Sequence, residues 1–290
     1  MMTLRELIRE GEEILRQAGV PDAGHDARIL FLDTFHMTSA EYVYSAGNTP
    51  ERTFSAPESV TAERMRIYRD RIRMRAERIP LQQILGTAAF MGLDFRVNAF
   101  TLCPRPDTEI LVEKVLKDTE GQQLKLLDLC TGTGCIGISL GILGSFTGVT
   151  LTDLSEKALE TARFNAENLG AGKPCSFRLY QGDLFDALPA GFACDVIVSN
   201  PPYIPEKVID TLEPEVRDYE PRMALSGGRD GLEIYRRLIA EAPETAPALY
   251  LEIGYDQAEA VSGLMEEAGY RGIRVIKDYG GRDRVVAGHV

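Results

Sequence analysis

Apolar residues recur at helical spacing through residues 1–80 of the chain. This spacing predicts helices over residues 3–20, 22–35 and 39–47, separated by short breaks. A longer helix is expected over residues 56–80, because its apolar stripe continues up to a proline and proline cannot continue a helix. We therefore predict that this region forms a small, all-helical N-terminal domain.

The pattern changes after residue 80. Residues 81–103 hold β-prone positions broken by glycine and asparagine, which predicts a β-hairpin linker. A helix is expected over residues 105–118, with proline near its start. The expected strands beyond it cover residues 124–130, 148–153, 176–181, 194–199, 247–253, 272–277 and 283–288. The expected helices between them cover residues 134–143, 155–169, 228–241 and 256–268.

This alternation predicts an α/β domain over residues 104–290. Strands and helices that follow one another at this spacing favour a seven-stranded, mostly parallel sheet with helices on both faces. The first strand leads into a glycine turn and a helix in KLLDLCTGTGCIGISLG. Gly132, Gly134 and Gly137 fit the pattern GxGxxG, in which glycine lets the backbone approach a ligand. Taken alone, the pattern also fits an ordinary tight turn.

Acidic residues follow the next two strands. Asp153 ends the second strand, where a carboxylate can accept both ribose hydroxyl protons. Asp183 follows the third, where it can accept from an adenine amino group while Leu184 packs on the ring. Each acid alone also suits a helix cap or a turn. Together with the glycines, they predict a nucleoside site at the carboxyl edge of the sheet.

Two ligand classes fit such a site. A dinucleotide needs close pyrophosphate contact at a helix N-terminus. S-adenosylmethionine has no phosphate, and its ammonium group requires an acceptor. Asp128 and the carbonyls of the glycine loop supply negative character there, which favours the methyl donor without deciding between the two.

The fourth strand ends in VIVSNPPYIP. Proline cannot donate to a sheet ladder, so the strand must stop there. The side-chain oxygen of Asn200 and the carbonyl of Pro201 are acceptors held rigidly by the prolines, and Tyr203 offers a flat face. Two acceptors and a ring suit an NH2 group on a planar π system. A proline-rich strand exit with Asn200 as a turn residue is the alternative.

NPPY after an apolar strand resembles the class I S-adenosylmethionine-dependent amino-methyltransferases, which have a Rossmann-like fold. The segments PLQQILG, LCPRPDTEILVE, LLDLCTGTGCIGISL, SNPPYI and DYGGRDRVV, in this order, resemble the HemK/PrmC family. The resemblance covers residues 80–290, and the helical region matches the family in length and character. These proteins are protein-(glutamine-N5) methyltransferases that act on peptide chain release factors.

The resemblance implies methyl transfer from S-adenosylmethionine, leaving S-adenosylhomocysteine, to the glutamine of the GGQ motif in release factors 1 and 2. The implied donor-binding residues are Asp128, Cys130, Thr131, Gly132, Thr133, Gly134, Asp153, Asp183, Leu184 and Asn200. The implied glutamine-binding residues are Asn200, Pro201, Pro202 and Tyr203, with Asn200, Pro201 and Tyr203 in the catalytic role. The N-terminal domain would recognise the substrate.

The chain departs from the usual family pattern at three positions. Cys130 stands where the family usually has glycine, which leaves the local loop conformation open. Leu102 and Cys103 replace commoner residues before PRPDTE and can reshape the substrate entrance.

Other functions remain open. A glutamine methyltransferase for a ribosomal protein could use the same NPPY site. A nucleic-acid amino-methyltransferase is a further alternative, and a nicotinamide dehydrogenase would share the glycine loop. A non-catalytic release-factor-binding module would not need an intact donor pocket.

Charge and composition narrow the partners. The net charge of −12 opposes direct binding to nucleic acid. No apolar run reaches the roughly 18 residues that span a bilayer, and the N-terminus lacks an export signal. Five scattered cysteines without a CxxC pair suit a reduced, cytoplasmic protein. The three histidines lie far apart, so we expect no metal site, and we expect a monomer.

The helix before Pro80 carries seven arginines on the faces that its apolar stripe leaves open. They are Arg64, Arg66, Arg69, Arg71, Arg73, Arg75 and Arg78. One interpretation is a solvated helix exchanging ion pairs with Glu63, Asp70 and Glu77. The other is a docking surface for an acidic or RNA-associated partner.

Overall fold

The computed structural model describes residues 2–54 and 58–290 and contains two compact units. The first consists of Met1–Gly86 together with Pro214–Tyr219, and the second of Thr87–Glu213 and Glu220–Val290. None of the helices described is long and apolar enough to cross a membrane. The predicted division into functional domains at residues 80 and 103 stays a prediction.

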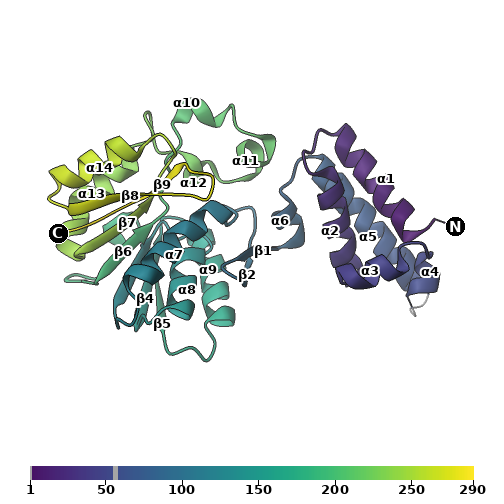
Figure 1. The fold of residues 1–290 in the computed structure, drawn as a ribbon, viewed down its shortest axis with the longest axis horizontal. Helices are drawn as coiled ribbons and strands as arrows, with labels where there is room; N and C mark the ends of the chain where they lie inside the picture. Colours follow the sequence, from purple (N-terminus) through teal and green to yellow (C-terminus); the bar gives the residue numbers. More distant parts are fainter. Residues whose placement is uncertain (1, 55–57) are drawn as a thin grey trace. The chain divides into compact units, whose positions relative to one another are not determined.

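The first unit is helical (Figure 1). Its elements are α1 (Leu4–Gln17), α2 (Ala23–Phe35), α3 (Ser39–Ser45), α4 (Pro50–Thr53), α5 (Glu58–Ala76), α6 (Leu81–Leu85) and α11 (Pro214–Tyr219). Thr3 and Thr38 begin α1 and α3 with capping boxes, in which the threonine hydroxyl accepts a backbone N–H three residues on. Phe31, Tyr68 and Ile72 are buried in the core shared by α1, α2 and α5.

The arginine-rich helix ends earlier than predicted. α5 stops at Ala76, four residues before Pro80, because Arg78 adopts φ +70°. The Arg78 N–H donates to the Arg75 carbonyl at 2.9 Å and the Ile79 N–H to the Met74 carbonyl at 3.3 Å, the pattern of a Schellman C-cap. The first two residues of the predicted helix, 56 and 57, lie outside the described residues.

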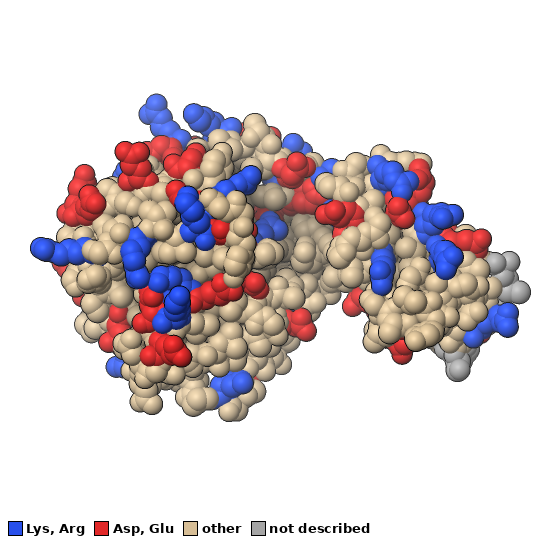
Figure 2. Space-filling view, viewed as in Figure 1, with Lys and Arg blue, Asp and Glu red and all other residues tan. Residues whose placement is uncertain are grey.

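Six of the seven arginines of this segment form ion pairs within the first unit. The pairs join Arg66 to Glu63 and Asp70, Arg69 to Glu10, Arg71 to Asp33, Arg73 to Asp70, Arg75 to Asp26 and Glu215, and Arg78 to Glu215. Figure 2 shows basic side chains lying among acidic ones on the visible face of this unit. The pairing supports the ion-paired interpretation of the helix, while a docking role stays a prediction.

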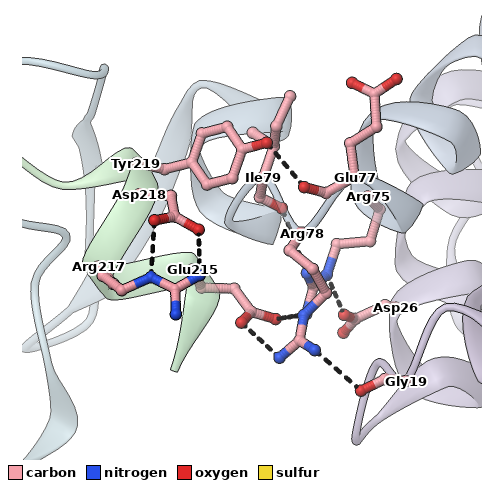
Figure 3. Close-up of polar contacts among 10 residues, drawn as sticks. All are labelled: Gly19, Asp26, Arg75, Glu77, Arg78, Ile79, Glu215, Arg217, Asp218 and Tyr219. Carbon is pink, nitrogen blue, oxygen red and sulfur yellow. Dashed lines mark hydrogen bonds and ion pairs between the residues drawn. The ribbon is translucent and has the colours of Figure 1, made fainter. Parts of the chain in front are cut away.

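The short helix α11 is held to the first unit by polar contacts (Figure 3). The Glu215 carboxylate accepts from Arg75 at 2.8 Å and from Arg78 at 2.6 Å. The Tyr219 hydroxyl donates to the Glu77 carbonyl at 2.7 Å, and the Gln83 side chain donates to the Tyr219 carbonyl at 3.0 Å. A segment that follows NPPY by about a dozen residues in the sequence therefore packs as part of the helical unit.

The second unit is built on a seven-stranded sheet with the order β5-β4-β3-β6-β7-β9-β8. The strands are β3 (Lys125–Leu129), β4 (Gly148–Asp153), β5 (Ser176–Gln181), β6 (Val196–Ser199), β7 (Ala248–Glu252), β8 (Arg271–Lys277) and β9 (Asp283–His289). All pairs are parallel except those of β9 with β7 and β8. The class I methyltransferase fold predicted from the sequence is thus confirmed.

Helices cover both faces of the sheet (Figure 1). One core contains residues of α7 (Glu109–Asp118), α8 (Cys135–Leu143) and α9 (Glu156–Leu169), and the other contains residues of α13 (Glu233–Thr245) and α14 (Ala258–Glu267). Successive strand residues alternate between them, since Leu126 lies in the first and Leu127 in the second. The strand order reverses between β3 and β6, where α/β sheets bind ligands at their carboxyl edge.

Short elements account for the differences from prediction. Residues 81–85 are helical as α6, so the expected hairpin occupies only β1 (Thr87–Phe90) and β2 (Leu93–Arg96). The helix expected from residue 228 begins at Glu233, because a glycine-rich loop precedes it. The sequence pattern missed α4, α10 (Glu206–Ile209), α11 and α12 (Arg222–Leu225), which are too short to show a period. The 3-10 turns η1 (Pro106–Thr108) and η2 (Leu184–Ala187) complete the unit.

Candidate active site

A pocket opens at the carboxyl edge of β3, β4 and β6, within the second unit. It encloses about 1100 Å³, including its open mouth. Nine residues predicted for the site line it, namely Cys130, Thr131, Gly132, Thr133, Asp153, Asp183, Leu184, Asn200 and Pro202. The fold thus brings the ends of four predicted strands to one cavity, as parallel strands of one sheet should.

Four predicted residues do not line this pocket: Asp128, Gly134, Pro201 and Tyr203. Asp128 and Pro201 are buried, and Tyr203 packs partly buried against the core of α13 and α14. Burial raises the pKa of the Tyr203 phenol, which therefore stays protonated. The direct contact with ligand predicted for these four residues stays a prediction.

The glycine loop needs its glycines for conformation and for close packing. Gly132 and Gly134 have φ +56° and +81°, in the left-handed region that favours glycine. A Cβ on Gly137 would lie 2.9 Å from the Asp128 carboxylate, to which the Gly137 N–H donates at 3.0 Å. The third glycine therefore allows α8 to start against β3.

The buried Asp128 carboxylate holds this loop by hydrogen bonds. Its Oδ2 accepts from the Thr131 hydroxyl at 2.6 Å as well as from Gly137. Burial raises the pKa of Asp128 to about 7, against these hydrogen bonds, which lower it. The observed contacts are those of a residue that holds the loop in shape.

Asp153 and Asp183 both reach the pocket, with different partners. Each oxygen of Asp153 accepts one backbone N–H, from Gly132 at 2.9 Å and from Ser155 at 2.8 Å. A carboxylate has about four lone-pair sites, so acceptor capacity remains. Burial raises the pKa of Asp153. Asp183 pairs with Arg237 at 2.8 Å, and both side chains are more than two-fifths exposed.

Cys130 has φ +57°, a conformation that costs a residue with a Cβ roughly 1–2 kcal/mol. This explains why glycine suits the position. Burial raises the pKa of its thiol to about 12, so the sulfur is a weak nucleophile.

The NPPY corner is held by residues that the sequence analysis missed. The Gln257 side chain donates to the carbonyls of Tyr203 at 3.0 Å and Gly231 at 3.1 Å. A Cβ on Gly227 would lie 2.7 Å from the Tyr203 Cα and 2.8 Å from the Pro202 carbonyl oxygen. The glycine-rich loop before α13 therefore packs directly on the NPPY backbone.

Two further buried side chains shape the pocket wall. Glu220 accepts from Arg105 at 2.8 Å and from the Cys103 N–H at 3.1 Å, and its side chain is fully buried. Asn165 donates to the Thr133 carbonyl at 2.9 Å and accepts from the Arg96 N–H at 2.8 Å. Both connect segments far apart in sequence, and no local pattern marks either residue. Leu102 and Cys103, singled out as departures, do line the pocket.

Comparison with known proteins places the chain in a family. The methyltransferase small domain matches residues 106–213, and the PrmC N-terminal domain matches residues 6–86. A release factor glutamine methyltransferase of Caulobacter vibrioides is 39% identical over 99% of this chain and 96% of its own. The chain belongs to the release factor glutamine methyltransferase family.

Other members of the family match over nearly the same length. The release factor glutamine methyltransferase of Cereibacter sphaeroides is 38% identical over 99% of this chain and 98% of its own, and that of Clostridium botulinum is 34% identical over 98% of both. The family resemblance drawn from NPPY and the glycine loop is confirmed. The relatives extend the resemblance across the helical unit, where the notable similarity in the sequence was one of length and helical character.

Solved structures agree on the fold. The catalytic domain of hMettl16, solved with an RNA hairpin of the MAT2A 3′UTR, has a TM-score of 0.56 at 14% identity and covers 76% of this chain and 80% of its own. A methyltransferase from Pyrococcus furiosus has a TM-score of 0.50 at 22% identity, over 69% of this chain and 90% of its own. The chain thus shares its fold with both of these structures.

Proposed function

We propose that the protein transfers a methyl group from S-adenosylmethionine to the side-chain amide nitrogen of the glutamine in the GGQ motif of release factors 1 and 2. The observation that carries the proposal is Asn200 at the wall of the pocket that the glycine loop and Asp153 also line. Membership of the family supports the same substrate, since its relatives carry that activity in their names.

The chemistry of the pocket fits S-adenosylmethionine better than a dinucleotide. Among the described residues that line it, Arg105 is the one basic side chain, and Glu220 neutralises it. A pyrophosphate would find little positive charge beyond the start of α8. Asp153 and Asp183 offer acceptors to ribose and adenine, and the acidic wall suits a cationic ligand.

We assign the glutamine to the NPPY corner. An amide nitrogen is a poor nucleophile because its lone pair is delocalised into the carbonyl. The Asn200 Oδ1 and the Pro201 carbonyl each accept one N–H of the substrate amide, which orients its nitrogen and stabilises the positive charge that develops on it. When bound, S-adenosylmethionine supplies the electrophilic methyl group. The proton then leaves to water, since no strong base lies among the predicted residues.

The test is incubation with purified release factor and methyl-labelled S-adenosylmethionine, followed by mass mapping of the GGQ peptide. We expect one methyl group on the glutamine, and none when that glutamine is replaced by alanine. Label confined to a ribosomal protein, to RNA or to DNA would refute the proposal. Titration with NADH serves as the control for a dehydrogenase, and we expect no binding.

A further inference from the structure

A buried carboxyl group lies beside the NPPY corner, outside the predicted site. Glu252 is the last residue of β7 and is 2% exposed. Its Oε2 is buried and has no hydrogen-bond partner among the described residues. Burying a carboxylate that lacks full pairing is unfavourable, so its presence needs a reason.

The sheet register places Glu252 next to Asn200. Ser199 pairs with Leu251 across the parallel strands β6 and β7, so the residues that follow them, Asn200 and Glu252, leave the sheet side by side. Thr108, at the end of η1, completes the group. The Asn200 Nδ2 donates to the Thr108 hydroxyl at 3.4 Å.

The charge state of Glu252 reflects these neighbours. Burial raises its pKa to about 7, while hydrogen bonding by Thr108, the charge of Arg284 and hydrogen bonding by Asn200 lower it. Thr108 and Asn200 are thus the two polar side chains that lower the pKa of the carboxyl group by hydrogen bonding, and they are bonded to each other at 3.4 Å. Above about pH 7 the group is an acceptor only.

This arrangement gives the group a fixed hydrogen-bond direction. A carboxylate cannot donate, so a Thr108 hydroxyl that bonds to Glu252 has to direct its hydrogen toward the carboxyl group. The hydroxyl oxygen is then free to accept from the Asn200 NH2. When the Asn200 NH2 group faces Thr108 and Glu252, its Oδ1 faces away from them. The substrate amide needs that oxygen as a hydrogen-bond acceptor.

We propose that Glu252 is a positioning residue, which acts on Asn200 directly and through Thr108 to keep the Asn200 amide oriented with its oxygen toward the substrate amide. The inference rests on the proposed function, since it assigns a task to Asn200 that the proposed function requires. A reversed amide would present NH2 to NH2 and could not hold the glutamine nitrogen.

The primary test is Glu252→Gln, which keeps the shape and lets the side chain donate as well as accept. We expect turnover at saturating donor to fall roughly 10- to 100-fold, less than the 10²–10³-fold cost of losing a preorganised contact outright, because Asn200 itself is still present. Donor affinity by calorimetry and the thermal midpoint should stay near wild type. Glu259→Gln, on the exposed side of α14, is the matched control and should leave all three quantities unchanged.

Substitutions of Thr108 test the relay separately. Thr108→Val removes the hydroxyl at nearly constant volume and should lower turnover to a similar extent, whereas Thr108→Ser should restore most of it. Because both positions act through one chain of hydrogen bonds, the Glu252→Gln and Thr108→Val effects should not multiply in the double variant. This pair keeps the inference testable if Glu252→Gln fails to fold.

The pH profile distinguishes positioning from packing. With wild-type enzyme at saturating donor, turnover should fall as pH drops through about 7. Protonated Glu252 can donate a hydrogen bond, so it no longer holds the Asn200 amide in one orientation. Glu252→Gln should lose this dependence. The Glu252 carboxyl group also has Coulombic interactions with five other titratable side chains, namely Arg284, Asp107, Tyr203, Tyr235 and Cys135. The pKa values of Arg284, the two tyrosines and Cys135 are all raised. Between pH 6 and 8 the tyrosines and the thiol therefore stay neutral and Arg284 stays positively charged.

Asp128 also has a pKa of about 7, but it shapes the donor loop and should affect donor affinity. Wild-type turnover together with an unchanged pH profile in Glu252→Gln would overturn the inference and leave the proposed function standing. A loss of donor affinity that accounts for the whole effect would also overturn it. Failure of the wild-type enzyme to methylate release factor would instead refute the proposed function.

Discussion

At the scale of single residues, the donor loop contains one side chain in an unfavourable conformation. Cys130 occupies φ +57° at the position where the family resemblance predicts glycine, and desolvation raises the pKa of its thiol. The strain is local, because Gly132 and Gly134 supply the other left-handed positions of the loop. A raised thiol pKa favours a structural over a nucleophilic role for this cysteine.

Replacing Cys130 by glycine should stabilise the protein. Relief of the left-handed strain outweighs the greater freedom of glycine in the unfolded chain, for a gain of about 0.5–1 kcal/mol. Thermal unfolding should show a midpoint higher by roughly one to three degrees. Cys130→Ala removes the thiol but keeps the Cβ, and it should not stabilise. An equal gain in both variants would attribute the effect to the sulfur.

Asn200→Ala should reduce turnover by about 10²–10³-fold, because one oriented acceptor for the developing positive charge is lost. Binding of S-adenosylmethionine should change little, and calorimetry measures it. Asp153→Ala is the complementary variant and should weaken donor binding, since its carboxylate holds Gly132 and is assigned to the ribose. Near-normal turnover in Asn200→Ala would remove this residue from the mechanism.

The sequence predicts which residues at strand ends line one pocket, but it does not mark the residues that only folding brings to them. Gly132, Asp153 and Asn200 each follow a recognisable strand, so their meeting at one sheet edge could be predicted. Glu220 and Glu252 carry no local signal, because each acts on partners that lie far away in the sequence. A charged residue at the end of an apolar strand, such as Glu252, is ordinarily predicted to be exposed to solvent, so its burial could not be predicted from the sequence.

At the scale of elements, long periodic segments were predicted within a few residues. The seven strands and the helices between them follow from period and length, whereas α6 and α10 to α12 span too few residues to show a period. The early end of α5 at Ala76 depends on Arg78 adopting a left-handed conformation, which is rare for arginine. The helix stop therefore could not be placed from Pro80 alone.

Gly11 lies where α1 packs closely against α5. Alanine normally stabilises a helix interior relative to glycine by about 1 kcal/mol. Here a Cβ would clash with the Tyr68 hydroxyl and lie 2.9 Å from Ile72 Cδ1. We expect Gly11→Ala to destabilise by about 1–3 kcal/mol in urea unfolding. Gly24→Ala in α2 is the control, because its Cβ would have ordinary contact distances, and it should be neutral or stabilising.

At the scale of the whole molecule, charge limits the partners. The chain carries a net charge of −12, and six arginines of its most basic segment already pair with acids. Attraction to a polyanion requires unpaired positive charge on one face. The charge distribution thus favours a protein substrate over a bare nucleic acid.

Binding to fluorescently labelled single-stranded RNA should therefore be weak. At 0.15 M salt we expect a Kd above about 10⁻⁴ M in fluorescence anisotropy, the weak end of non-specific binding. A basic RNA-binding domain measured in parallel provides the positive control. Micromolar affinity that declines with added salt would contradict this prediction. It would show that the ion-paired arginines still form a surface that attracts RNA.

The membership of Pro214–Tyr219 in the helical unit has a consequence for how such a protein can be divided or recombined. A gene fragment ending at residue 86 would encode Arg75 and Arg78 without their acceptor Glu215. Exchanging that unit with a homologue would therefore require two separate stretches of coding sequence to move together. A single crossover between residues 86 and 214 would combine the two stretches from different parents, and the Glu215 ion pairs would then form only where both parents carry the matching residues.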